Sequence, residues 1–581
     1  MFQLKWMWKY MGKKRHYFVI GLIIACVTSV ASFISPMLSQ RLIDEVITPE
    51  NPDPLVPILL TLIGVQLART SLRYLMIVLV EQNSQEMYDG LRKRLFHVIQ
   101  NEDYKFFRKM RTGDLMTRMT NDLDLVRHGA AWIAHSTIDA VVLFTTTMIF
   151  FFTIHVEMTL WLCIVTPGIF FITYFFSKII KPMYVKVRRR LSELNTVAQE
   201  NIEGNRVVKA FAREEFEKER FKEKNEEFRQ MNLKATYVAV KFQPFIDFLS
   251  QCLTVITILV GGIFMINGEI TAGNLLAIST MTWALATPLK MLGTILNDTQ
   301  RFFASANMII EVFYAEPSIV NRKNAIAPKE RAKGEVEFKN VDFTINRNPI
   351  LKDISFHIKP GETLGIMGTT GSGKTSIVST LLRFYEPQSG EVSLDGKNIQ
   401  DYTLSYLRNS LGVAFQDVFL FSDSVDMNIA YNNPEIPVED VYKFAKIADA
   451  DSFIKKMDDG YDTIVGERGV GLSGGQRQRI SLARALAVKP SVLVLDDTTS
   501  AVDSETEQYI QEQIKNLDFE CSKIIIAQRV SSIQHAKEII ILDKGEIIER
   551  GTHSQLLAKK GFYYHIWALQ NNVEEGGEID G

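Results

Sequence analysis

The stretch LGIMGTTGSGKTS, Leu364 to Ser376, predicts a phosphate-binding α/β domain. It reads as an apolar strand, a glycine-rich loop and the start of a helix, with the spacing G-x-x-x-x-G-K-[ST]. Glycine lets the backbone curl so that several N–H groups converge on phosphate oxygens, and the helix N-terminus adds positive potential. Lys374 adds a charge for the β- and γ-phosphates. The residues expected to bind the nucleotide here are Gly368, Thr369, Thr370, Gly371, Ser372, Gly373, Lys374, Thr375 and Ser376.

A second stretch, VLVLDDTTS from Val492 to Ser500, supplies acidic residues for such a loop. Its apolar residues predict a buried strand that ends in Asp496 and Asp497. An ATPase with a phosphate loop needs an acid at this point to hold Mg²⁺, directly or through water. Asp496 is that acid, and the hydroxyl of Thr375 is a second ligand. Asp497 stands where a base that activates water is expected.

The N-terminal half of the 581-residue chain has a different composition. Six apolar runs are long enough to cross a bilayer, which takes about 20 residues of helix. Buried helices of a soluble protein seldom stay apolar all round at this length. The first run is too long for a cleaved signal peptide and lacks an obvious cleavage site. The runs lie near residues 17–38, 55–80, 131–153, 158–180, 244–266 and 272–296.

The basic residues predict how these spans are oriented. Segments 81–130 and 181–243 are dense in Lys and Arg, whereas 39–54, 154–157 and 267–271 hold one basic residue between them. Positive-inside reasoning places the N-terminus in the cytosol, and six spans return the C-terminus there. We expect a multi-pass protein of the cell membrane, in contact with lipid. The net charge of −2 gives no basic excess for a nucleic-acid partner, and none is expected.

The long segments between spans read as continuations of the spanning helices into the cytosol. Each contains a short break that allows the chain to turn back. One is RTGDLMTRMTNDLD (111–124), with Gly113 at the turn, and the other is NIEGNRVVKAFAREE (201–215), with Gly204 at the turn. The residues alone predict charged helical hairpins, for which a solvated stalk is the plain alternative.

The stretch LSGGQRQRISLARAL, Leu472 to Leu486, resembles the signature sequence of the ATP-binding cassette (ABC) family. The loop Gly368–Thr375 is similar to that family's Walker A motif, and Asp496 to its Walker B aspartate. Gln416 in VAFQD resembles the Q-loop glutamine. The segment SAVD (500–503) resembles the D-loop.

Six spans ahead of one cassette resemble the exporter branch of the family. VGERG (465–469) is similar to the segment that precedes the signature in exporters. TGDLMTRMTND and GNRVVKAFARE are similar to its two cytosolic turns, which act there as coupling helices that press on the cassettes. The resemblance implies an α-helical membrane domain of six transmembrane helices fused to an α/β P-loop nucleotide-binding domain.

The resemblance also implies a dimer, because one chain holds one membrane half and one cassette. ATP lies in that family between the Walker motifs of one cassette and the signature of the other. The resemblance implies that Mg²⁺ binds together with ATP, with Thr375, Gln416 and Asp496 as its ligands. It also places Gln416 among the catalytic residues. The residues that the resemblance assigns to the partner's nucleotide are Ser473, Gly474, Gly475, Gln476 and Asp503.

Three positions depart from the family pattern. Asp497 stands where the family has glutamate, and it is one methylene shorter. Gln528, in AQR, replaces the switch-loop histidine and is always neutral. VDFTI offers no aromatic residue at Ile345 to stack on adenine. All three belong to the site that this chain's own Walker motifs build, whereas the signature is intact.

This asymmetry suggests that the chain is one subunit of a heterodimeric exporter. Its own site would be catalytically impaired, and its partner would be a second half-transporter. Multidrug exporters commonly have this arrangement, so a small amphipathic substrate is expected. The alternatives are a homodimeric exporter with a slow ATPase, a lipid or peptide exporter, and an ATP-binding regulator or sensor.

Ionisable residues inside the spans add a smaller hypothesis. Arg69 and Arg73 lie four residues apart on one predicted helix, as do His135 and Asp139 on another, and Asp247 begins a later span. Charges in a membrane are costly and usually face a cavity or pair with one another. A structural ion pair of Asp139 with an arginine and a contact with substrate are both open.

These observations divide the chain into four parts. Residues 1–315 are expected to be the transmembrane domain, 316–333 a linker and 334–572 the nucleotide-binding domain. The acidic tail 573–581 is expected to be disordered.

Overall fold

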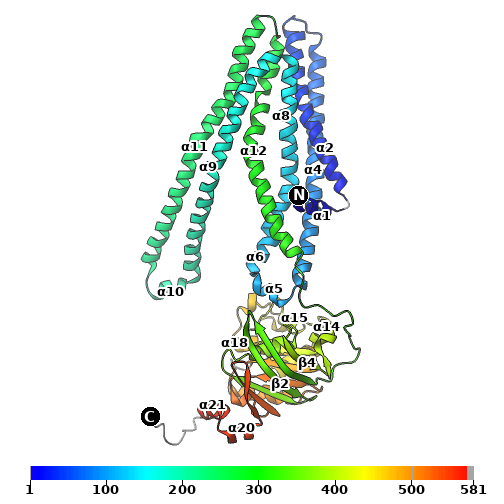
Figure 1. Ribbon diagram of the computed structural model, residues 1–581, viewed down its shortest axis with the longest axis vertical. Helices are drawn as coiled ribbons and strands as arrows, with labels where there is room; N and C mark the ends of the chain where they lie inside the picture. The colour runs from blue at the N-terminus through cyan, green and yellow to red at the C-terminus, as the bar shows by residue number, and fades with distance from the viewer. Residues whose placement is uncertain (1, 13, 499–501, 572–581) are drawn as a thin grey trace. The chain divides into compact units, whose positions relative to one another are not determined.

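The computed structural model describes residues 2–12, 14–498 and 502–571, which form two compact units (Figure 1). The first unit comprises Met1–Asn101 and Arg111–Ala315, and the second comprises Glu102–Met110 and Glu316–Gly581. The acidic tail 573–581 and two residues of the D-loop, Ser500 and Ala501, lie outside the described residues.

The first unit is helical. Its described residues include six helical segments that are long and apolar enough to cross a membrane, and each contains one predicted span. The segments are Arg15–Ile47, Leu55–Asn101, Thr112–Ile154, Val156–Glu203, Glu214–Ile266 and Ala272–Phe313. The principal helices in them are α2 (Arg15–Val30), α4 (Leu55–Asn101), α8 (Ala134–Ile154), α9 (Val156–Glu203), α11 (Glu214–Ile266) and α12 (Ala272–Phe313), and α1 (Phe2–Tyr10) precedes them. The prediction of a six-helix membrane domain is confirmed.

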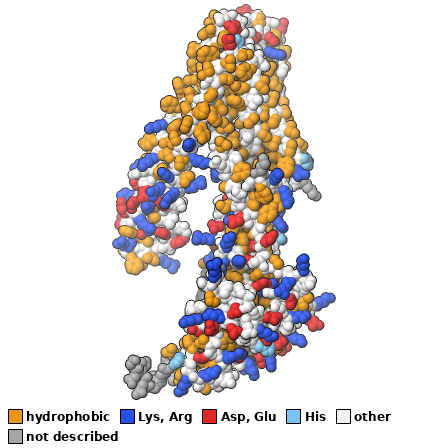
Figure 2. Space-filling view, in the orientation of Figure 1, with side chains coloured by type: hydrophobic (Ala, Val, Ile, Leu, Met, Phe, Trp, Pro, Cys, Tyr) orange, Lys and Arg blue, Asp and Glu red, His pale blue; other side chains and the backbone are white. Residues whose placement is uncertain are grey.

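Helices α9 and α11 form a long hairpin that diverges from α4, α8 and α12 toward its tip at α10 (Asn205–Ala210; Figure 1). Charged side chains gather near this tip, while apolar side chains cover the spans (Figure 2). Two ion pairs join the helices there: Arg190 Nη1 lies 2.8 Å from Glu227 Oε2, and Arg220 Nη2 lies 2.9 Å from Glu200 Oε2. Exposed pairs of this kind contribute little energy singly, but together they help to hold the two helices in register.

The two cytosolic turns have different outcomes. Gly204 ends α9 as predicted. The first turn precedes 111–124, because α4 ends at Asn101 and a short helix, α5 (Tyr104–Lys109), follows; Gly113 lies inside the next helix, α6 (Thr112–Thr117). The prediction of a turn at Gly113 was therefore wrong, since a glycine is tolerated within a helix.

The signal for the first turn is an aspartate. Asp103 caps α5 by accepting a hydrogen bond from Phe106 N at 3.0 Å. Helix α5 belongs to the second unit: Asp103 also accepts from Ser318 N at 2.7 Å, and the Tyr104 ring stacks on Phe384 with centroids 5.6 Å apart. In addition, Arg108 Nη2 donates to Asn346 Oδ1 at 3.1 Å.

The described charged residues within the spans do not form the suggested ion pair between Asp139 and an arginine. Asp139 accepts a hydrogen bond from Ser29 Oγ at 2.7 Å, and within the described part of the chain no ion pair joins it to Arg69 or Arg73. Asp247 instead pairs with Lys290 of α12, with 2.9 Å between Oδ1 and Nζ.

The second unit is built on two sheets. A four-stranded sheet has the order β2-β1-β4-β5, and a six-stranded sheet has the order β10-β9-β3-β8-β7-β6, parallel except for β10. The strands are β1 (Val336–Ile345), β2 (Asn348–Ile358), β3 (Thr363–Gly368), β4 (Ser389–Leu394), β5 (Lys397–Asn398), β6 (Leu411–Ala414), β7 (Val492–Asp496), β8 (Ser522–Ile526), β9 (Glu538–Asp543) and β10 (Glu546–Gly551).

The parallel strands of the larger sheet are covered on both faces, which explains why they are largely apolar, whereas β10 at its edge is partly exposed. In β7, Val492 and Val494 face the core shared with the smaller sheet, while Leu493 and Leu495 face a second core. A third core lies under the C-terminal helices. The helices of this unit are α13 (Lys374–Leu381), α14 (Leu404–Asn409), α15 (Val425–Ile429), α16 (Val438–Ile447), α17 (Asp451–Ile454), α18 (Gly474–Ala487), α19 (Ser504–Lys515), α20 (His553–Lys559) and α21 (Phe562–Gln570).

We expect Lys290→Met to reduce the yield of folded protein, because it leaves the Asp247 carboxylate without its partner in a span. Adding Asp247→Asn should restore the yield, since no unpaired charge remains. Size-exclusion profiles of the detergent-solubilised variants measure this. A single Lys290→Met variant that is as abundant and monodisperse as the parent would show that the pair has no structural role.

Candidate nucleotide site

The phosphate loop joins β3 to α13, and its glycines are required by the space around them. At Gly373 the backbone has φ of 103°, and a Cβ atom would lie 2.8 Å from Ile350 O. At Gly368 a Cβ atom would lie 2.1 Å from Leu542 O. Side chains at either position would push the loop away from the sheet. The loop residues 369–372 and Ser376 complete the connection as the sequence predicts, with Thr369 Oγ1 donating to Asp543 Oδ1 at 3.0 Å.

Lys374 lies against this loop. Its Nζ donates to Gly368 O at 2.9 Å and to Thr369 O at 2.7 Å. Burial lowers the pKa of the Lys374 ammonium, and the negative charges of Asp496 and Asp497 oppose that shift. A phosphate group at the loop would add further negative charge beside the ammonium, so the arrangement favours an anionic ligand.

Asp496 ends β7 beside the loop. Thr375 Oγ1 donates to Asp496 Oδ2 at 3.0 Å, so the two side chains that were predicted to hold a metal ion are in contact. Burial raises the pKa of Asp496, and the Thr375 hydrogen bond opposes this. A carboxylate and a hydroxyl are hard oxygen ligands that fit Mg²⁺, which would neutralise phosphate charge when bound there. Gln416, the third predicted ligand, is exposed two residues beyond the end of β6, at the same edge of the sheet.

Two of the three residues that depart from the family pattern, Asp497 and Gln528, lie at this edge of the sheet, just after neighbouring strands. Asp497 directly follows β7 and has a left-handed backbone, with φ of 52°. Its N–H donates to Ile526 O at 2.8 Å, which ties it to the end of β8. Gln528 is exposed two residues after β8. Asp497 and Gln528 therefore lie on adjacent loops beside the phosphate loop.

The position expected to face adenine holds Ile345, the third residue that departs from the family pattern. Ile345 is the last residue of β1 and pairs with Asn348. Its aliphatic side chain packs partly into the core between the two sheets, so it offers no aromatic face to a base. The neighbouring Asn346, which binds Arg108 of α5, was not identified from the sequence.

The signature residues begin α18 on the surface of the cassette. Ser473 and Gln476 form a capping box: Gln476 N donates to Ser473 Oγ at 3.2 Å, and Ser473 N donates to Gln476 Oε1 at 2.8 Å. Ser473 and Gly474 are exposed, and Gly475 is half-buried. Asp503 similarly caps α19 by accepting from Thr506 N at 3.1 Å. This leaves the N-terminus of α18 open to a ligand held elsewhere.

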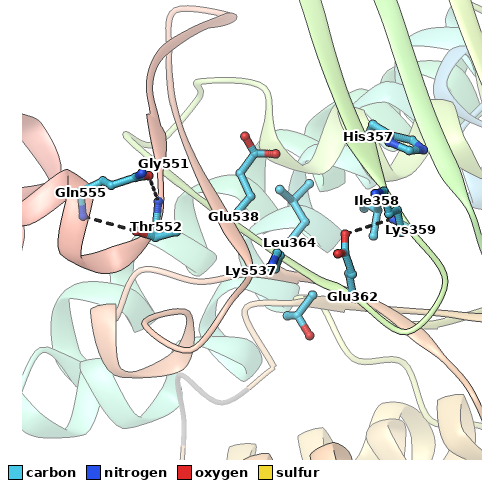
Figure 3. Close-up of a pocket in the computed structure, with 11 residues that line it drawn as sticks. His357, Ile358, Lys359, Glu362, Leu364, Lys537, Glu538, Gly551, Thr552 and Gln555 are labelled. Atoms are coloured by element: carbon cyan, nitrogen blue, oxygen red, sulfur yellow. Dashed lines mark hydrogen bonds between the residues drawn. The ribbon is translucent and has the colours of Figure 1, made fainter.

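A surface hollow of the cassette lies away from these residues. A cavity of about 320 Å³ is lined by the first residues of β3 and by Gly551, Thr552 and Gln555 (Figure 3). Thr363 and Leu364 begin β3, whereas the phosphate loop follows its other end, so the cavity lies at the opposite edge of the sheet. A nucleotide site that needs two cassettes is expected to look open in one chain.

Comparison with known proteins agrees with this architecture. Residues 18–289 match the ABC transporter transmembrane region, and residues 351–500 match the ABC transporter domain. The ATP-dependent lipid A-core flippase of Syntrophus aciditrophicus (strain SB) is 33% identical over 561 residues, which cover 96% of this chain and 92% of the relative. The putative multidrug export ATP-binding/permease protein YgaD of Bacillus subtilis (strain 168) is 34% identical over 498 residues, 84% of each chain.

The fold also matches that of a solved exporter structure. A bacterial Atm1-family ABC exporter solved with ATP bound superposes with a TM-score of 0.79 at 24% identity, covering 98% of this chain and all of that one. The chain belongs to the ABC transporter family and has the architecture of an exporter half-transporter: a helical membrane domain fused to an ABC nucleotide-binding domain. Membership of this family implies ATP binding and, in general, transport driven by ATP hydrolysis.

Acidification should weaken Mg²⁺-dependent nucleotide binding through Asp496. Because the pKa of this aspartate is raised, its carboxylate is protonated, and lost as a metal ligand, at a higher pH than an exposed aspartate would be. We expect Asp496→Asn to remove both the Mg²⁺ dependence and its pH profile.

Binding of a fluorescent ATP analogue, with and without Mg²⁺ over a pH series, measures the effect. Asp518→Asn is the control, because Asp518 precedes β8, at the end of the strand away from the phosphate loop, and its pKa is lowered by its hydrogen bond with Lys443. The assignment of Asp496 fails if Asp496→Asn binds Mg²⁺–ATP as the parent does.

Proposed function

We propose that this chain is one subunit of a heterodimeric ABC exporter that moves drugs or other amphipathic compounds out across the cell membrane. Its termini lie in the cytosol, and its own Walker site binds ATP but hydrolyses it poorly. The observation that carries the proposal is the gathering of Asp497 and Gln528 at one edge of the sheet, beside an intact phosphate loop.

The chemistry of these two side chains supports an impaired site. General-base catalysis requires the base to reach the attacking water, and Asp497 is shorter than the usual glutamate by one methylene. Gln528 is always neutral, so it cannot accept a proton or carry a charge as histidine can. Lys374, Thr375 and Asp496 are retained, so binding of the nucleotide is less affected than its hydrolysis.

The half that this chain would contribute to a partner supports an unlike dimer. Ser473 and Gln476 form a complete capping box, and the exposed end of α18 is free to meet a nucleotide held by the Walker motifs of a second cassette. A second half-transporter with glutamate and histidine at the two altered positions would supply a competent site, with Mg²⁺ as the companion of ATP.

The relatives support two classes of substrate. The multidrug export relative favours small amphipathic compounds. The lipid A-core flippase favours the alternative, a homodimeric lipid exporter, and its similarity extends over almost the whole chain. In proteoliposomes, drug-stimulated ATPase activity that requires a partner supports the first, and lipid-stimulated activity of the chain alone supports the second.

The purified chain alone should be nearly inactive. A dimer of identical chains would contain two sites with Asp497 and Gln528, and loss of a well-placed base costs about 10²–10⁴ in rate. Steady-state ATPase assays on protein shown to be free of other subunits provide the measurement. Turnover of several ATP molecules per second would overturn the heterodimer proposal.

Two mutations in this chain should differ in effect when it is complexed with its partner. Ser473→Arg places a bulky side chain where the partner's nucleotide is expected, so transport and most ATPase activity should be lost. Asp497→Asn changes only the weak site and should spare most steady-state hydrolysis.

Ser473→Ala is the matched control, because it removes the helix cap, at a cost of about 1 kcal/mol, without adding bulk. Asp497→Glu combined with Gln528→His should increase hydrolysis at the second site. If Asp497→Asn abolishes ATPase activity as completely as Ser473→Arg, both sites are catalytic and the proposed asymmetry is wrong.

A further inference from the structure

The C-terminal helix α21 holds the loop that carries Gln528. Its last residue, Gln570, makes two hydrogen bonds to that loop: Val530 N donates to Gln570 Oε1 at 2.9 Å, and Gln570 Nε2 donates to Gln528 O at 2.8 Å. One carboxamide thus binds the backbone on both sides of Arg529. Because its donor and acceptor are fixed in one plane, it sets the path of the loop.

This loop leaves the sheet at the centre of the nucleotide site. Strand β8 lies between β3, which leads into the phosphate loop, and β7, which ends in Asp496. Ile526 pairs with Ile366 on one side and Asp496 on the other. Ala527 N then donates to Ile366 O at 3.1 Å. Gln528 follows immediately, so its position beside the phosphate loop depends on how the next two residues are held.

A second tether holds the loop from the side of the D-loop. Arg529 Nη1 donates to Val502 O at 3.3 Å and to Glu507 Oε2 at 3.4 Å. The Glu507 side chain is buried, and it also accepts a hydrogen bond from Ser532. The loop is therefore fixed on one side by α19 and on the other by Gln570.

Helix α21 is itself firmly placed, so Gln570 acts as an anchor. Tyr563 of α21 is fully buried in the same core as Val530, and Ile566 and Trp567 pack against that core. Gln570 itself is exposed at the end of this helix, and its side chain extends to the loop. Its role is not evident from the sequence, because a lone glutamine near the C-terminus matches no motif.

We propose that Gln570 is a positioning residue that holds residue 528 where it meets the γ-phosphate, so that α21 governs how well this site distinguishes ATP from ADP. The inference rests on the proposed function of this site as an ATP site. The γ-phosphate is the group that ADP lacks, so a loosened loop weakens ATP binding selectively.

The test uses the full-length chain in detergent and fluorescent analogues of ATP and ADP. Gln570→Met keeps the length of the side chain but removes its donor and acceptor. We expect affinity for the ATP analogue to fall about tenfold, from loss of two ordinary hydrogen bonds, and affinity for the ADP analogue to stay within about twofold. Gln570→Glu keeps an acceptor for Val530 N and should be intermediate.

Hydrogen–deuterium exchange gives a second readout on the same proteins. The peptide spanning residues 527–533 should exchange faster in Gln570→Met, while peptides from β3 and α13 should not change. Leu569→Ala is the matched control, because Leu569 is the preceding residue of α21 and is 75% exposed. It should alter neither exchange nor affinity.

Three results would overturn the inference. Unchanged exchange would show that Gln570 does not hold the loop. Faster exchange with unchanged ATP affinity would show that the loop does not reach the γ-phosphate. Equal loss of ATP and ADP affinity would assign Gln570 a role in folding only. A parent chain that binds neither analogue would instead refute the proposed ATP site, and the inference with it.

Discussion

The parallel pairing of β8 with β3 and β7 is the constraint on which the nucleotide site depends. Ile526 is paired with Ile366 on one side and Asp496 on the other, which sets the phosphate loop, the Asp496 carboxylate and the loop that carries Gln528 at one edge. Parallel strands present their carboxyl ends together, so ligands of such sheets bind there. A shift in this register would separate Asp496 from Thr375, whose side chains are in hydrogen-bond contact.

Much of this arrangement could be predicted from local sequence. Apolar runs of spanning length predicted the six membrane helices, and the glycine spacing predicted the phosphate loop, because both depend on residues that are adjacent in the chain. The first cytosolic turn was misplaced because Gly113 looked like a helix breaker, while the true signal was the cap at Asp103. The Asp247–Lys290 pair and the Gln570 contacts join residues far apart in sequence, so no local pattern predicts them.

Different interactions stabilise the membrane unit and the cassette. In the cassette, the apolar residues of a parallel strand such as β7 alternate between two cores, so the strand is stabilised on both faces. In the spans, lipid is as apolar as the helix surfaces, so no hydrophobic force drives the helices together. Polar contacts therefore contribute a larger share of the free energy of helix association. The Ser29–Asp139 hydrogen bond and the Asp247–Lys290 ion pair therefore help to fix how α2 packs on α8 and α11 on α12.

The proposed separation of ATP binding from ATP hydrolysis in the nucleotide site follows from the different atoms that each requires. In the proposed site, most of the binding uses the backbone of the phosphate loop, Lys374 and the Thr375–Asp496 pair, which are held by the sheet and by α13, while residue 528 adds selectivity for ATP over ADP. Hydrolysis needs a base and a γ-phosphate sensor on the flanking loops, where Asp497 and Gln528 stand. The loops are supported independently of the phosphate loop, by Gln478, Glu507 and Gln570. Substitutions at the two altered positions can therefore weaken turnover and leave the nucleotide-holding structure in place, which is the property required of a site that closes on ATP but leaves hydrolysis to its partner.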